Sequence, residues 1–114
     1  MKRSLRELRI PKEIEEALED LVERLKESLG EFKLYLFGSY ARGDWVRGIS
    51  DVDIVVVSPK FRGVHPVERA AMVRKLARPG IPLEVLCYTQ EELEELLKTS
   101  AFIREISSYW IELY

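Results

Sequence analysis

The pattern of apolar and polar residues changes period several times along the chain, and these changes outline its elements. Between residues 11 and 30, apolar residues recur at the three- and four-residue spacing of one helix face, opposite a charged face. Three short apolar runs are predicted as buried strands: 32–37, 52–58 and 82–88. Further helices are predicted at 40–46, at 66–78 and from Thr89 onward, where Thr89 and Glu92 form a capping-box pattern.

The order of these elements predicts how the strands pair. A helix joins the strands at 52–58 and 82–88, which favours parallel pairing through a right-handed crossover. The strand at 32–37 is taken to lie antiparallel beside 52–58. We therefore expect one α/β (α+β) domain over residues 1–114, with a small mixed sheet of three or slightly more strands covered by helices.

Residues 100–114 are predicted as a C-terminal amphipathic helix. Its apolar stripe is rich in aromatic residues and comprises Phe102, Ile103, Ile106, Tyr109, Trp110 and Leu113. One interpretation is that this stripe closes the core. The other is that it docks a second copy of the chain or another protein, because aromatic residues are enriched at interface hot spots.

Composition and charge narrow the class of protein. Hydrophobic residues make up 46% and charged residues 33% of the chain, which is typical of a soluble globular domain. The net charge of −2 argues against a nucleic-acid binder that relies on a broad basic surface. No stretch approaches the roughly 18 apolar residues of a membrane span, so we expect a cytoplasmic protein. Cys87 is expected in the core, and the absence of Asn favours a thermophilic source.

Asp51 and Asp53 are the most informative residues of the chain. They stand two residues apart at the start of an apolar run, so in a strand both carboxylates would point to the same face. Two unit charges about 4 Å apart repel by roughly 4 kcal/mol at an effective dielectric of ~20. A fold tolerates this repulsion if the carboxylates are solvated, if one is protonated, or if a divalent cation lies between them.

A second motif, Gly38-Ser39, directly follows the first predicted strand. A glycine there allows the backbone to approach a ligand closely, and Ser39 can cap a short helix whose free N–H groups favour phosphate. Antiparallel pairing would bring this corner next to Asp51 and Asp53. Arg42 on the short helix could neutralise phosphate charge, or it could be an ordinary surface cation. The sequence thus predicts a phosphate cradle beside a carboxylate metal site.

Together, Gly38-Ser39, Arg42-Gly43 and Asp51-x-Asp53 resemble the motif of the nucleotidyltransferase superfamily that includes DNA polymerase beta. Within it, the chain is most similar to the minimal nucleotidyltransferases, and the resemblance covers roughly residues 12–99. The gap of eleven residues between Ser39 and Asp51 is one more than the commonest spacing.

The resemblance implies roles for these residues. Asp51 and Asp53 would ligate one or two Mg²⁺ ions, and the Gly38-Ser39 corner would hold the phosphates of ATP or another nucleoside triphosphate. The position of the family's third carboxylate is Glu84 here, where the family usually has Asp. Glu84 would bind the second ion or help to deprotonate the acceptor hydroxyl.

The resemblance also implies a function and a partner. Minimal nucleotidyltransferases often act with a helical HEPN-domain protein as toxin–antitoxin pairs, in which the nucleotidyltransferase is the antitoxin. We therefore expect Mg²⁺-dependent transfer of AMP from ATP to a hydroxyl of a HEPN-type partner. Two alternatives remain: a non-catalytic antitoxin that neutralises its partner by binding, and a transferase that modifies an antibiotic or another small molecule. A homo-oligomer is equally compatible with the sequence.

Overall fold

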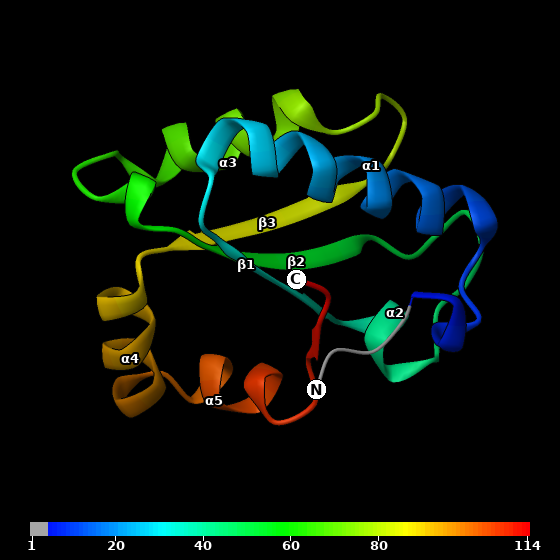
Figure 1. The fold of residues 1–114 in the computed structure, drawn as a ribbon. Helices are drawn as coiled ribbons and strands as arrows, with labels where there is room; N and C mark the ends of the chain where they lie inside the picture. The colour runs from blue at the N-terminus through cyan, green and yellow to red at the C-terminus, as the bar shows by residue number, and fades with distance from the viewer. Residues whose placement is uncertain (1–4) are drawn as a thin grey trace.

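The computed structural model describes residues 5–114 and shows a four-stranded mixed sheet between two layers of helices (Figure 1). The strands are β1 (Lys33–Phe37), β2 (Val52–Val57), β3 (Leu83–Tyr88) and β4 (Ile111–Glu112), in the spatial order β3-β2-β1-β4. One face is covered by α1 (Lys12–Leu29) and α3 (Pro66–Leu76), and the other by α4 (Gln90–Thr99) and α5 (Ala101–Ser107). The expected fold class is confirmed.

Three short helical segments complete the described chain. The helix α2 (Ser39–Arg42) follows β1, and single 3₁₀ turns lie at Leu5–Leu8 and Pro59–Phe61. The predicted helix at 40–46 is therefore shorter, because Gly43 adopts a left-handed conformation (φ 93°) that ends it. The prediction of one domain over 1–114 stays a prediction, and its first four residues lie outside the described part.

The predicted strand pairings are confirmed, and their register positions the acidic residues. β1 pairs antiparallel with β2, which sets Phe37 opposite Asp53. β3 pairs parallel with β2, which sets Glu84 opposite Asp53. Residues opposite each other on neighbouring strands point to the same face of a sheet. Glu84 and Asp53 therefore share one face.

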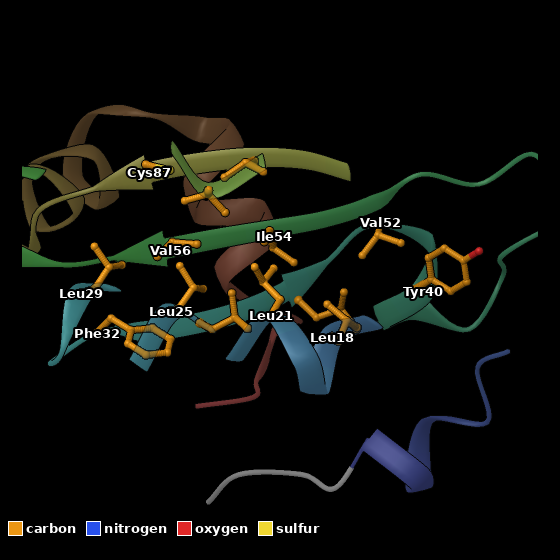
Figure 2. Packing of buried hydrophobic residues seen from close by; sticks show 14 of the residues in the cluster. Leu18, Leu21, Leu25, Leu29, Phe32, Tyr40, Val52, Ile54, Val56 and Cys87 are labelled. Carbon is orange, nitrogen blue, oxygen red and sulfur yellow. The ribbon is translucent and has the colours of Figure 1, made fainter. Parts of the chain in front are cut away.

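The central strand β2 is apolar on both faces because helices cover both faces of the sheet. On one face, Ile54 and Val56 are completely buried, and Figure 2 shows Leu18, Leu21 and Leu25 of α1 packed against them. On the other face, Val55 and Val57 belong to a second cluster with residues of α4 and α5. Cys87 lies in the first cluster, as expected.

The predicted C-terminal helix 100–114 is wrong beyond its first half. The helix α5 ends at Ser107, and the chain then turns and adds β4 to the free edge of β1. The pairing satisfies backbone groups that a helix would have left open: the Leu113 N–H donates to the Leu34 carbonyl at 2.8 Å. Aromatic stacking supports it, since the ring centroids of Trp110 and Tyr35 lie 4.2 Å apart.

The first half of the tail closes the core, as one of the two interpretations held. Ile103 and Ile106 of α5 are each 2% exposed and pack in the second cluster.

No helix in the described part of the chain, residues 5–114, is long and apolar enough to cross a membrane.

A partly buried ion pair fixes the beginning of α4 to α3. The guanidinium of Arg69 is buried and donates to both carboxylate oxygens of Glu92, at 2.6 and 3.1 Å. It also donates to the backbone carbonyls of Cys87 and Val64. Glu92 in turn completes the predicted capping box with Thr89, and the ion pair lowers the pKa of Glu92 to about 2.

We predict that Arg69→Met lowers the free energy of unfolding by about 2 kcal/mol, because it leaves two carbonyls and a carboxylate without their buried donor. The cost stays below that of a fully buried pair, since the Glu92 side chain is 43% exposed and can be rehydrated. The matched control is Arg62→Met, which breaks an exposed pair with Glu91 and should cost under about 0.5 kcal/mol. Urea unfolding measures both, and equal costs would contradict the assignment.

Candidate active site

Gly38 forms the corner between β1 and α2 and lies directly against Asp53. Its backbone is in the left-handed region, with φ at 73°, and it is the N-cap residue of α2. A Cβ atom at this position would overlap the Oδ2 atom of Asp53 and come within 2.9 Å of its Cγ. Only glycine therefore allows this close approach of the backbone to the carboxylate.

Ser39 is the first residue of α2, and the expectation that it caps the helix is wrong. Gly38 takes the cap position, and no side chain caps this helix. The difference follows from the positive φ of Gly38, which begins the helix one residue earlier than the sequence indicated. Ser39 lines an open pocket of about 320 Å³ together with Gly38 and Asp53.

Asp53 is partly buried at the start of β2, where it interrupts an otherwise apolar strand. The pKa of Asp53 is raised from the ordinary value of 3.8 to about 6, mainly by burial and further by the negative charges of Asp51 and Glu84, against the opposing effect of Arg42. Both neighbouring carboxylates are thus close enough to repel Asp53. The repulsion between Asp51 and Asp53 could be relieved by solvent, by protonation of one carboxylate or by a divalent cation. The raised pKa of Asp53 supports partial protonation when no cation is bound.

Asp51 and Glu84 are both exposed, in different surroundings. Asp51 lies in the loop just before β2. Glu84 lies on the edge strand β3, and the guanidinium of Arg74 approaches its carboxylate to 3.7 Å. Arg74 also donates to the backbone carbonyl of Leu83, so it comes from α3 around the open edge of the sheet. No local pattern in the sequence indicates that Arg74 lies beside Glu84.

Arg42 makes a contact that sequence reasoning missed. Its Nη1 atom donates to the hydroxyl of Tyr109 at 3.2 Å, and its Nε atom donates to Asp44 at 3.3 Å. The backbone N–H of Gly38 donates to the same Tyr109 hydroxyl at 3.1 Å. Tyr109 lies in the turn between α5 and β4, far from Gly38 in sequence, so no local pattern could have revealed this contact.

The pocket is closed on its second side by α5. Besides the corner and Asp53, it is lined by Arg42, Phe37, and four residues of the C-terminal part: Phe102, Glu105, Ile106 and Tyr109. One wall thus carries donors and a cation, and the opposite wall carries aromatic rings and a carboxylate.

The loop between α2 and β2 is well anchored despite its additional residue. Trp45 stacks on Tyr40 of α2, with ring centroids 5.7 Å apart. The Oγ atom of Ser50 accepts the Val46 N–H at 2.8 Å, and Arg47 bonds Glu13 of α1 at 2.6 Å. The longer spacing between Ser39 and Asp51 is therefore absorbed by a compact turn.

The donor set of Asp51, Asp53 and Glu84 suits a hard divalent cation, because all three offer carboxylate oxygens and repel one another without one. Within residues 5–114, no three His, Cys, Asp or Glu side chains already form a ready group around one point. The fit therefore rests on the chemistry of the donors and on the shared face of Asp53 and Glu84.

We predict that Gly38→Ala lowers the free energy of unfolding by more than the left-handed backbone alone costs, which is about 1–2 kcal/mol. Gly63→Ala is the control, since Gly63 has a similar φ of 76° but nothing within 4 Å of the added Cβ atom. Urea unfolding should show an additional loss of about 1–3 kcal/mol for Gly38→Ala. Combining Gly38→Ala with Asp53→Ala should recover most of this additional loss, and simple additivity would argue against the contact.

A second prediction concerns pH. Because the folded-state pKa of Asp53 is raised to about 6, its stabilising contribution is fully present below pH 3.8 and is lost as the pH rises through 6. A shift of about two units corresponds to roughly 3 kcal/mol, and solvent screening of this partly exposed group reduces it to about 1 kcal/mol. In EDTA, Asp53→Asn should therefore gain about 1 kcal/mol over the wild type between pH 4 and 7. Parallel stability curves would show that the repulsion is absent.

Two solved structures share the overall fold of this chain. A crystal structure from Sulfolobus solfataricus, provisionally named a nucleotidyltransferase, shares the fold with a TM-score of 0.61 and 24% identity over 83% of this chain and 82% of the other. A second crystal structure, provisionally named in the same way, has a TM-score of 0.59 and 26% identity over 85% of this chain and 97% of the other.

Among curated protein sequences, none matches this chain. The family model described as "Nucleotidyltransferase domain" matches residues 10–111, which includes the glycine-serine corner and all three carboxylates. The chain therefore belongs to the nucleotidyltransferase domain family.

Proposed function

We propose that this nucleotidyltransferase uses Mg²⁺ and ATP, or another nucleoside triphosphate, to transfer a nucleoside monophosphate to a hydroxyl group of a protein partner. One observation carries the proposal: the register of three strands brings Asp53 beside both the Gly38-Ser39 corner and Glu84. A phosphate-binding corner and two carboxylates on one face of the sheet are the parts that this reaction needs.

Different residues of the site bind the triphosphate, hold the metal ion and accept a proton. The Gly38 N–H and the Ser39 hydroxyl bind phosphate oxygens, and Arg42 neutralises part of the charge of the triphosphate. Asp51, Asp53 and Glu84 hold Mg²⁺, which supplies charge neutralisation at the reacting phosphate when bound. Glu84 is exposed and can accept the proton of the incoming hydroxyl, while pyrophosphate leaves.

The partner and the acceptor are the finer part of the proposal. The resemblance to minimal nucleotidyltransferases favours a HEPN-type protein as the acceptor, with this chain as the antitoxin. The exposed positions of Asp51 and Glu84 support an acceptor that approaches from outside, since a macromolecular hydroxyl can reach both carboxylates.

A non-catalytic antitoxin is the second candidate. The contact between Arg74 and Glu84 favours it, because a cation near the third carboxylate competes with a metal ion for that ligand. The two functions differ in one measurable property, the transfer of label from the nucleotide.

The test is to incubate the protein with ATP labelled in the α-phosphate, Mg²⁺ and the product of the neighbouring gene. The wild type should label the partner, and Asp53→Asn should lower the rate by about a thousandfold through loss of a ligand worth several kcal/mol. Ser39→Ala should mainly raise the KM for ATP. Asp20→Asn, which changes an exposed pair with Arg24 on α1, should leave the rate unchanged.

Tight binding of the partner without any transfer of label would overturn the catalytic proposal in favour of the neutralising one. Label transfer that Asp53→Asn leaves intact would contradict the assignment of the site.

A further inference from the structure

Phe102 is an aromatic side chain that the fold leaves exposed beside the candidate active site. The large hydrophobic side chains exposed in the described part of the chain are Val46, Ile49, Val67 and Phe102, and only Phe102 among these carries a ring. It is 52% exposed although Ile103 and Ile106 on the same short helix are buried. Core packing therefore does not account for its position.

Phe102 lines the same pocket as Gly38, Ser39 and Asp53. Its ring stands perpendicular to that of Phe37, with centroids 6.2 Å apart and an interplanar angle of 81°. Phe37 is itself buried and lies opposite Asp53 in the sheet register. A buried aromatic residue thus supports Phe102 at the side of the pocket that adjoins the acid.

The charged groups of the pocket determine which end of a nucleotide lies on which side. The Gly38 N–H and the Arg42 guanidinium lie on the side of α2, where an anion is favoured. Glu105 lies one helical turn beyond Phe102 and also lines the pocket. Its carboxylate repels phosphate, so an uncharged part of the ligand must lie against α5.

From this arrangement we propose that Phe102 forms a stacking surface for the nucleobase of the bound nucleoside triphosphate. The inference rests on the proposed function and adds to it how the base is held. The pocket of about 320 Å³ is of the size that binds small ligands. The strength of stacking on one aromatic ring depends on the area of the base and not on its hydrogen-bonding groups. Purines have the larger rings, so ATP and GTP bind more tightly than CTP and UTP.

The test compares ligands with and without a base, using the full chain in Mg²⁺ and calorimetric titration. Phe102→Ala should weaken ATP binding by roughly tenfold and leave the binding of inorganic tripolyphosphate unchanged. Phe102→Trp should retain ATP affinity, and ATP should quench its additional fluorescence relative to the wild type while tripolyphosphate should not. Val67→Ala, which removes another exposed apolar side chain on α3, should change neither affinity.

Three outcomes would overturn the inference. If Phe102→Ala leaves ATP affinity unchanged while tripolyphosphate still binds, the base lies elsewhere and the proposed function stands. If Phe102→Ala leaves ATP affinity unchanged but abolishes labelling or binding of a partner protein, Phe102 is a docking residue for that partner. If the wild type binds neither ATP nor tripolyphosphate, the proposed function fails together with this inference.

Discussion

The close approach of Gly38 to the carboxylate of Asp53 is the constraint on which the site depends. Asp53 is the polar interruption of a strand that is apolar on both faces, and it sits between the end of β1 and the start of β3. Its charge is disfavoured by burial and by two neighbouring carboxylates. A fold that keeps a charged group in such a place loses stability there, which is common where a site must bind a cation or move a proton.

The rest of the fold holds this arrangement in place. Helices on both faces bury β2, so the position of Asp53 along the sheet is fixed by register, since a slip of one residue would turn the side chain to the opposite face. α5 covers the same face of the sheet, and its residues Phe102, Glu105 and Ile106 line the pocket together with Asp53. The ion pair between Arg69 and Glu92 secures the start of α4, and through it the layer to which α5 belongs.

Much of the fold could be predicted because the information was local. The alternation of apolar runs and amphipathic segments indicated β1, β2, β3 and the helices between them, and a strand–helix–strand order gave parallel pairing of β2 with β3. From that topology the shared face of Asp53 and Glu84 followed. The Gly38-Ser39 corner could be recognised because Asp51 and Asp53 follow it in the chain, since neither motif is specific alone.

What could not be predicted depends on contacts that are distant in sequence. The end of the chain pairs with β1, and its apolar spacing alone is equally compatible with a longer helix. The choice is made by the open edge of β1 and by the stacking of Trp110 on Tyr35. The apolar spacing places Tyr109 and Phe102 on one stripe but does not place them at the site, and no pattern in the sequence distinguishes Arg74. Each reaches the site across elements whose relative placement the sequence does not state.

The hydroxyl of Tyr109 has a consequence for any anion that enters the corner. It accepts hydrogen bonds from both the Gly38 N–H and the Arg42 guanidinium. A phosphate oxygen that binds these donors must displace the Tyr109 hydroxyl. The hydrogen bonds lost by Tyr109 therefore reduce the net binding free energy of the phosphate. Tyr109 lies just before β4, which pairs with the edge of β1. Binding of phosphate at Gly38 is therefore coupled to the stability of the pairing between β4 and β1. Variants of the chain extended or shortened at that end would then differ in apparent ligand affinity even with every binding residue intact.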